Sequence, residues 1–330
     1  MKRNVEIFNK SNKGNISNIS NISDTNNKNN GSFKIFLQIF MAVIMIFFLF
    51  SVLIVSADKK HPETVFANHN AKIDFTETNK NGTVKINTVL KFEEKIKVTI
   101  TKNEKDSMIY TYDLKNDKSI EAYPLQMGDG EYIIKVWQHV KGTTFKLILT
   151  AGYTVELANS NAPFLSPNQY VNFNENSKVV KKAAELTKNC KTDIEKIEKI
   201  YKYVINTLEY DAHRAATVQD DYLPSVDEII AAGKGICFDY AAVLAAMLRS
   251  QGIPTKLVIG YVKNVDGDDD IYHAWNKVYL EKGELTIHCV RLENSHLIRI
   301  DPTFDSSSKS SKAFAQYIKN HDNYMIEKKF

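Results

Sequence analysis

The sequence has little net charge and few cysteines, and each shortage narrows the possible functions. Its 330 residues carry a formal net charge of only +4, which is too small to indicate a nucleic-acid partner. The three cysteines are an odd number, and neither their spacing nor their neighbours are typical of a zinc site. We therefore expect no metal and no other cofactor. In other respects the composition is that of an ordinary globular protein, and the length allows two domains.

Long apolar runs are scarce as well, and the clearest one lies near the N-terminus. Residues 35–55 are almost wholly apolar, and about twenty such residues span a bilayer. The residues before this run are rich in Asn, Ser and Lys, a composition that favours disorder. Basic residues outnumber acidic ones there, so the positive-inside rule places this leading segment in the cytoplasm. We expect a disordered cytoplasmic segment, residues 1–32, followed by a membrane-spanning segment, residues 33–57.

The membrane-spanning segment has two interpretations. Val55-Ser56-Ala57 resembles the small-residue site at which a signal peptide is cleaved. The apolar run is, however, longer than the roughly 7–15 residues that are usual for a signal peptide. The sequence therefore favours a retained single-pass anchor in the cell membrane, with the rest of the chain outside. Secretion after cleavage near Ala57 is the alternative.

Short alternating segments dominate residues 70–158. Apolar and polar residues alternate in them as in half-buried strands, and glycine-containing turns separate them. We expect an all-β sandwich, and because it shows no catalytic residues we interpret it as a spacer or a binding platform. A linker that contains Asn and Pro, residues 159–176, separates it from the C-terminal part. The clearest alternating segments are residues 83–87, 95–100, 131–136 and 144–149.

The C-terminal part, residues 177–330, is organised around one cysteine. Cys237 follows two glycines that interrupt regular structure, and the run after it is rich in Ala and Leu, with no further Gly or Pro before Gly252. This run predicts a helix that is apolar nearly all round, and therefore buried, with Cys237 at its start. Unpaired N–H groups and the positive end of the helix dipole at that position favour a thiolate over a thiol. Cys237 is thus a candidate nucleophile.

Three predicted strands follow this helix, at residues 254–262, 272–280 and 296–303, because β-branched and aromatic residues are frequent in them. His273 lies on the second strand, and Asp301 ends the third. A thiol nucleophile needs a base within hydrogen-bond reach, and that base needs a partner that fixes its tautomer. A cysteine, a histidine and an aspartate in this setting are the minimal set for acyl transfer.

Five short blocks in this region, in this order, resemble the transglutaminase-like superfamily. They are Gly-Ile-Cys-Phe-Asp-Tyr-Ala, Arg-Ser-Gln-Gly-Ile-Pro, Gly-Tyr, His-Ala-Trp and Ile-Asp-Pro-Thr, and the resemblance covers roughly residues 177–310. It implies an α+β fold, a papain-like transglutaminase core with a central helix against an antiparallel sheet. It also implies that Cys237 is the nucleophile, that His273 is the general base and acid, and that Asp301 orients His273.

The resemblance suggests one further site residue, and the residues around His273 suggest two more. Tyr210 lies where members of the family often carry a polar residue that lines the active site, so it is a candidate oxyanion contact or, equally, a packed tyrosine. Trp275 and Tyr261 would wall an apolar tunnel beside His273 or pack within the sheet. The chain departs from the family pattern at Ile298, where many members have Trp.

About fifteen residues that follow Leu280 form an insertion relative to the family pattern. This insertion includes Cys289, and outside the cytoplasm Cys190 and Cys289 would either pair or stay free. A cluster of aspartates at residues 266–270 lacks the later Glu of a calcium-binding loop, so we interpret it as a charged hairpin tip.

The resemblance and the predicted membrane anchor together imply an extracytoplasmic enzyme that transfers amide acyl groups through a thioester on Cys237. The expected substrate is a protein or peptide amide, for which the location suggests the cell wall or the cell surface, and the resemblance favours transglutaminase-like protein crosslinking or modification. A cysteine peptidase or amidase on the same three residues is one alternative. A surface module that binds a partner without catalysis is the other, and the presence of Cys237, His273 and Asp301 argues against it.

Overall fold

The computed structural model describes residues 63–89, 95–102, 109–115, 118–219, 221–264, 269–280, 290–294, 297–308 and 312–330. The predicted cytoplasmic segment and membrane anchor, residues 1–32 and 33–57, lie outside the described residues. Among the helices that the structure describes, none is both long and apolar enough to cross a membrane. The described part combines helices with antiparallel sheets, which agrees with the predicted mixture of the two.

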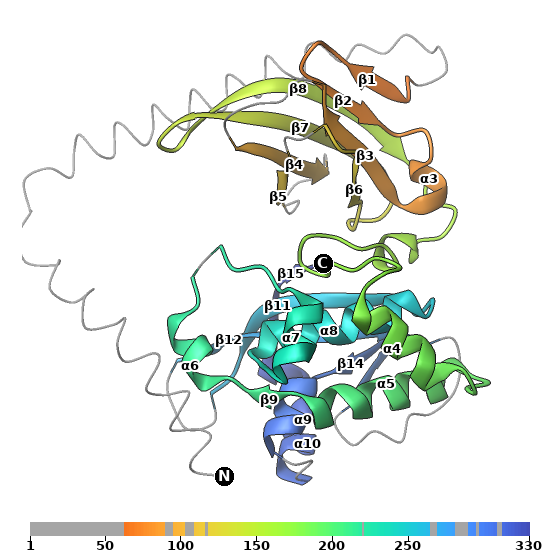
Figure 1. Ribbon diagram of the computed structural model, residues 1–330, viewed down its shortest axis with the longest axis vertical. Coiled ribbons are helices and arrows are strands. Elements are labelled where there is room, and N and C mark those ends of the chain that lie inside the picture. Colours follow the sequence, from red (N-terminus) through yellow and green to blue (C-terminus); the bar gives the residue numbers. More distant parts are fainter. Residues whose placement is uncertain are drawn as a thin grey trace, which may run out of the picture. The chain divides into compact units, whose positions relative to one another are not determined.

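Two four-stranded sheets make up the first described part of the chain (Figure 1). Their strand orders are β1-β2-β3-β6 and β5-β4-β7-β8, and neighbouring strands are antiparallel. Alternate residues of one strand, Ile96, Val98 and Ile100, are buried in the apolar core, so the sequence alternation has the period of a strand. The elements are β1 (Val65–Ala67), β2 (Ala71–Asp74), α3 (Thr78–Asn81), β3 (Thr83–Thr88), β4 (Ile96–Lys102), β5 (Tyr110–Leu114), β6 (Glu121–Pro124), β7 (Gly130–Lys141) and β8 (Thr144–Val155).

The C-terminal part is built on a five-stranded antiparallel sheet with the order β13-β14-β12-β11-β15. Alternate residues of β11 enter two different apolar clusters. Leu257 and Ile259 belong to the main core with helix α8, whereas Val258 and Val262 belong to a smaller cluster with Trp275. Both faces of this sheet are therefore covered. Its strands are β11 (Thr255–Val262), β12 (Ile271–Tyr279), β13 (Val290–Asn294), β14 (Leu297–Ile300) and β15 (Tyr324–Lys329).

Helices surround this sheet, and four of them, α4, α5, α7 and α9, pack against α8. Helices α4 and α5 are the first two of these along the chain. Thr192 accepts a hydrogen bond from the Glu195 N–H at 3.2 Å and so caps α5. The helical elements are η1 (Ala162–Phe164), α4 (Lys178–Thr187), α5 (Asp193–Thr207), α6 (Ala212–Thr217), α7 (Val226–Ala232), α8 (Cys237–Ser250), α9 (Pro302–Ser308), α10 (Lys312–Lys319) and η2 (His321–Asn323).

Helix α8 is the central helix that the sequence predicts. Every residue from Asp239 to Arg249 is buried, so small alanines alternate with larger apolar residues on all sides of the helix. The helix gives way to the next strand through Gly252, whose φ of +78° suits glycine far better than other residues. A helix that is enclosed in this way holds its first residue, Cys237, on a rigid support.

Candidate active site

The turn before α8 places Cys237 at the first position of the helix. Gly233 ends α7 with a φ of +68°, and Gly235 follows in the short strand β10 (Lys234–Gly235). A Cβ atom on Gly235 would come within 2.6 Å of the Cβ atom of Asp239, so only glycine fits there. The two glycines are therefore requirements of the turn that positions the half-buried Cys237 thiol.

Asp239, in the first turn of the same helix, is a buried carboxylate that the sequence analysis did not single out. Its Oδ2 atom accepts a hydrogen bond from the Ile236 N–H at 2.9 Å and lies 3.3 Å from Arg214 Nη1. Its Oδ1 atom accepts a hydrogen bond from the Tyr222 hydroxyl at 2.6 Å. Burial raises the pKa of Asp239, and these three partners oppose that rise. Asp239 thus caps the helix that carries Cys237.

His273, on β12, is 1% exposed, and its Nε2 atom lies 2.8 Å from the Oδ2 atom of Asp301. Burial alone would lower the pKa of His273. The negative charge and the hydrogen bond of Asp301, followed by those of Cys237, outweigh burial and raise the pKa to about 10. Because Asp301 occupies Nε2, Nδ1 is the ring nitrogen left for the Cys237 thiol. With this pKa the ring carries its proton at neutral pH, and it lies between the Cys237 sulfur and the Asp301 carboxylate.

Asp301 directly follows β14 and is fully buried. Its Oδ1 atom accepts a hydrogen bond from the Phe304 N–H at 3.2 Å, at the start of α9. Its Oδ2 atom accepts one from the Tyr324 hydroxyl at 2.8 Å in addition to its contact with His273. The structure therefore brings together the three residues that the sequence selects and adds Tyr324 to them.

Two aromatic rings lie parallel to the imidazole of His273. Phe304 stacks on it with a centroid distance of 4.4 Å, and Trp275 lies 6.2 Å away. Trp275 is fully buried and meets the edge of Tyr324 in the smaller apolar cluster. Of the two interpretations of Trp275, packing within the sheet agrees with this position and a contact with substrate does not. Trp275 and His273 share one face of the strand, and Trp275 is enclosed by the smaller apolar cluster.

The exposed aromatic residues near His273 are two tyrosines. Tyr261 is 42% exposed and Tyr272 is 57% exposed, and their rings pack edge to face at 5.3 Å. Gly260 pairs with His273 in the register of β11 and β12, so the tyrosine pair is the next row of the sheet. Because successive side chains of a strand point to opposite faces, Tyr272 and its partner Tyr261 lie on the face away from the His273 ring, so the expectation that Tyr261 walls a tunnel beside His273 does not agree with this position.

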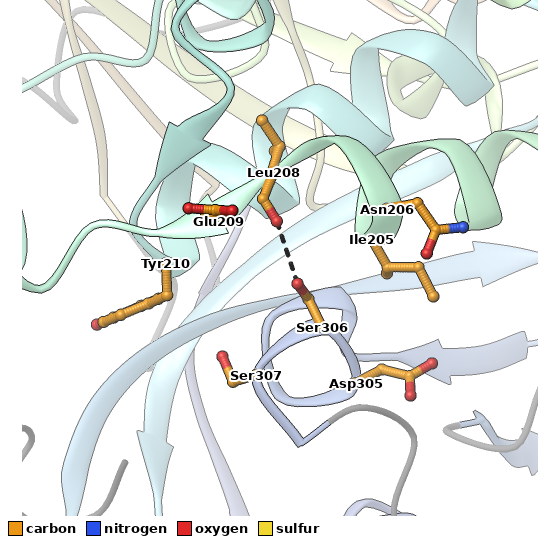
Figure 2. A pocket seen from close by; sticks show the side chains of 8 residues that line it. All are labelled: Ile205, Asn206, Leu208, Glu209, Tyr210, Asp305, Ser306 and Ser307. Atoms are coloured by element: carbon orange, nitrogen blue, oxygen red, sulfur yellow. Dashed lines mark hydrogen bonds between the residues drawn. The ribbon is translucent and has the colours of Figure 1, made fainter. Parts of the chain in front are cut away.

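Tyr210 lies on the short strand β9 (Glu209–Tyr210), which pairs with β10 just before Cys237. Burial raises the pKa of Tyr210, and the neighbouring Cys237 is the next cause. The Tyr210 hydroxyl therefore stays protonated. It lies close enough to Cys237 for the charge of a Cys237 thiolate to raise the pKa of Tyr210. Figure 2 shows the pocket of about 510 Å³ that Tyr210 helps to line, in which Ser306 donates a hydrogen bond to the Leu208 carbonyl at 3.2 Å. Its lining residues are Ile205, Asn206, Leu208, Glu209, Tyr210, Asp305, Ser306 and Ser307.

The remaining candidate positions from the sequence are possible metal ligands and the two other cysteines. Within the described ranges, no group of three or more His, Cys, Asp or Glu side chains is placed to hold a metal ion. Most of the aspartate cluster at residues 266–270 lies outside those ranges. Cys190 is a half-buried free thiol. Cys289 lies outside the described residues, so the two expected states of Cys190 and Cys289, paired or free, are both still open to test.

Comparison with known proteins gives one family match and several partial likenesses. Residues 180–287 match the model of the transglutaminase-like superfamily. Kyphoscoliosis peptidase of Homo sapiens is 31% identical over 106 residues, which are 30% of this chain and 16% of that protein. The Mus musculus protein of the same name is 30% identical over an equal length and the same shares of both chains. The match thus spans only a small part of these relatives.

Two solved structures are similar to the chain at low sequence identity. One is a candidate cysteine protease from Cytophaga hutchinsonii, with 14% identity, a TM-score of 0.38 and coverage of 73% of both chains. The other is a candidate protease from Parabacteroides distasonis, with 16% identity and a TM-score of 0.25 over 56% of this chain and 36% of that one. Neither likeness is close enough to add to the family match.

Proposed function

Residues 180–287 form a domain of the transglutaminase-like superfamily, and from this premise we propose that the protein transfers amide acyl groups through a thioester on Cys237. The observation that carries the proposal is the position of His273. Its ring is buried between the Cys237 thiol and the carboxylate of Asp301, which lies 2.8 Å from Nε2. A nucleophile, a base and a residue that orients the base are the three roles that cysteine-dependent acyl transfer needs.

The first half of the proposed reaction starts from the pair of Cys237 thiolate and protonated His273, because the pKa of His273, raised to about 10, keeps the ring charged. The Cys237 thiolate attacks the carbonyl carbon of a substrate amide, and the carbonyl electrons move to the oxygen. The Cys237 N–H at the start of α8 stabilises the oxyanion, and the protonated Tyr210 hydroxyl is a second donor. As the oxyanion collapses, the C–N bond breaks and His273 gives its proton to the leaving amine. The product is a thioester on Cys237 together with a free amine or ammonia.

The second half of the reaction decides the class of enzyme. His273 removes a proton from an incoming amine or water, which attacks the thioester and restores the Cys237 thiolate. We propose transamidation, the crosslinking or modification of proteins, as the main outcome. Its support is the match of residues 180–287 to the model of the transglutaminase-like superfamily.

Hydrolysis by a peptidase or amidase is the second candidate. A single observation favours it: the relatives that are about 30% identical over the shared segment are named peptidases. The same three residues serve both reactions, so the difference depends on access of water to the thioester.

We also propose that the reaction takes place outside the cytoplasm, with residues 33–57 as a membrane anchor. The support is the length and apolarity of this segment and the basic residues before it. Protease added to intact cells should then digest the part of the chain that carries Cys237. Protection of that part until the cells are lysed would contradict this location.

The purified full chain should be given a glutamine-containing peptide and a biotinylated primary amine. Transamidation predicts a biotinylated peptide and released ammonia, and Cys237→Ala should abolish both products while Cys190→Ala retains them. Ammonia or peptide fragments without biotin incorporation would assign hydrolysis instead. No product from any amide, together with an unreactive Cys237, would contradict the enzyme assignment and favour a binding module.

A further inference from the structure

Tyr324 is a buried tyrosine at the start of β15, outside the segment that matches the family model. Its hydroxyl donates a hydrogen bond of 2.8 Å to the Oδ2 atom of Asp301. The same oxygen lies 2.8 Å from His273 Nε2. One carboxylate oxygen of Asp301 thus accepts hydrogen bonds from two donors, so its negative charge interacts with both His273 and the Tyr324 hydroxyl.

The ring of Tyr324 is held firmly on two sides. The guanidinium of Arg299 lies over its face, 3.9 Å from the ring centroid, and the ring of Trp275 meets it nearly at a right angle at 5.0 Å. Arg299 is itself anchored, because its Nη2 atom donates to the carbonyls of Ile318 and Asn320. These contacts fix the direction of the Tyr324 hydroxyl.

The protonation state of Tyr324 keeps it a donor. Burial raises the pKa of Tyr324 well above its ordinary value, and the negative charge of Asp301 raises it further. The hydroxyl therefore keeps its proton throughout the pH range in which His273 titrates. The Tyr324 hydroxyl is thus a permanent donor to the Asp301 carboxylate.

We propose that Tyr324 is a positioning residue that fixes the Asp301 carboxylate and weakens its hold on His273, so that His273 releases its proton more readily to the leaving amine. The inference rests on the proposed function, because it assigns Tyr324 a part in that reaction. Without the hydroxyl, the full charge of Oδ2 would act on His273. The His273 proton would be bound more tightly, and the carboxylate would be free to turn.

The test is Tyr324→Phe in the full chain, which keeps the ring and removes only the hydroxyl. Loss of a hydrogen bond to a charged group should lower the kcat of Tyr324→Phe by roughly tenfold. The KM of this variant should stay within about twofold of the wild-type value. The alkaline limb of the kcat profile should move upward by about 0.5–1 pH unit. Rates are taken per molecule whose Cys237 reacts with iodoacetamide, so that misfolded protein does not count.

Tyr317→Phe is the matched control. The Tyr317 ring packs against Phe304 at 5.7 Å and against Tyr324 at 6.2 Å, but its hydroxyl donates to the Lys263 carbonyl rather than to Asp301. This variant should keep kcat within about twofold and leave the alkaline limb in place. Equal effects of Tyr317→Phe and Tyr324→Phe would mean that the hydrogen bond to Asp301 is not the cause and would overturn the proposal.

NMR titration of the His273 ring separates this inference from the proposed function, because it needs no substrate. Tyr324→Phe should raise the measured pKa of His273, and Arg299→Lys, which loosens the Tyr324 ring, should raise it by less. An unchanged His273 titration in Tyr324→Phe overturns the inference even where the enzyme turns over amides. An enzyme without amide turnover overturns the proposed function, whatever the titration gives.

Discussion

The two ends of helix α8 each bury one charged side chain, and the two side chains have different hydrogen-bond partners. Asp239 in the first turn bonds to the Ile236 N–H and to Tyr222, and the half-exposed Arg214 lies beside it. Arg249 in the last turn is 3% exposed. Both charges have the sign that the helix dipole favours at their end. The difference lies in what surrounds them.

Arg249 donates to three backbone carbonyls from separate segments of the chain: Thr255 at 2.8 Å, Ser166 at 2.7 Å and Phe330 at 2.7 Å. Burial lowers the pKa of Arg249 to about 9. This end therefore fastens the linker, β11 and the C-terminus to the helix. The other end presents a thiol beside His273 and ends at the surface. The comparison shows that the C-terminal end of α8 contributes to the stability of the fold, whereas its N-terminal end carries the reactive cysteine.

The largest expected effect is on the chemical end. Asp301→Asn keeps the shape of the side chain but removes the charge that holds His273, so kcat per folded molecule should fall by roughly 10²–10⁴-fold. The control is Asp305→Asn, because Asp305 is buried close by and accepts the Tyr201 hydroxyl at 2.5 Å. Asp305→Asn should lower stability and leave kcat per folded molecule within a few-fold. Steady-state kinetics and urea denaturation of both variants measure the two effects, and a reversed order would contradict the assignment of Asp301.

A substitution of Arg249, at the C-terminal end of α8, should lower stability rather than kcat. Arg249→Met leaves three buried carbonyls without their donor, which should cost about 3 kcal/mol or more in the free energy of unfolding. The activity of the molecules that remain folded should be close to that of the wild type, because Arg249 lies at the far end of the helix. Denaturant titration and active-site labelling test this separation. A loss of kcat per labelled Cys237 that matches the loss for Asp301→Asn would break the comparison between the two ends.

The smallest expected effect is the pH dependence of stability at the chemical end. The pKa of His273 is raised to about 10 in the folded protein, against 6.5 for an ordinary histidine. Protonated His273 therefore adds stability fully below pH 6.5, and this contribution is lost as the pH rises through about 10. The stability difference between wild type and His273→Gln should be largest near pH 6 and shrink toward pH 10. A difference that grows over this range would contradict the ion pair with Asp301.

The positions of Cys237, His273 and Asp301 could be predicted because each depends on local sequence signals. Two glycines and a run of helix formers define the start of α8, and the β-branched segments define β12 and β14. The coarse α+β architecture with antiparallel sheets could be predicted from the same signals. The membrane segment lies outside the described residues and stays a prediction.

The rest of the site depends on contacts that no local pattern reveals. Tyr324 reaches Asp301 from the far edge strand β15, and Tyr222 reaches Asp239 from a loop before α7. Trp275 is a case in which sequence position misleads. It lies two residues from His273, which suggested that both side chains would line the same apolar tunnel. Strand alternation puts both residues on one face, and only the three-dimensional packing shows that Trp275 is enclosed by the smaller cluster.

The most direct test of the account is acylation of the full chain by an activated ester, followed by peptide mass mapping. If Cys237 and His273 form the reacting pair, a stoichiometric burst of the leaving group should accompany a thioester on Cys237. The burst should be lost in His273→Ala and kept in Cys190→Ala. Acyl groups found mainly on lysines or on Cys190, or an equal burst in His273→Ala, would contradict the claim that Cys237 is the nucleophile of an acyl-transfer centre.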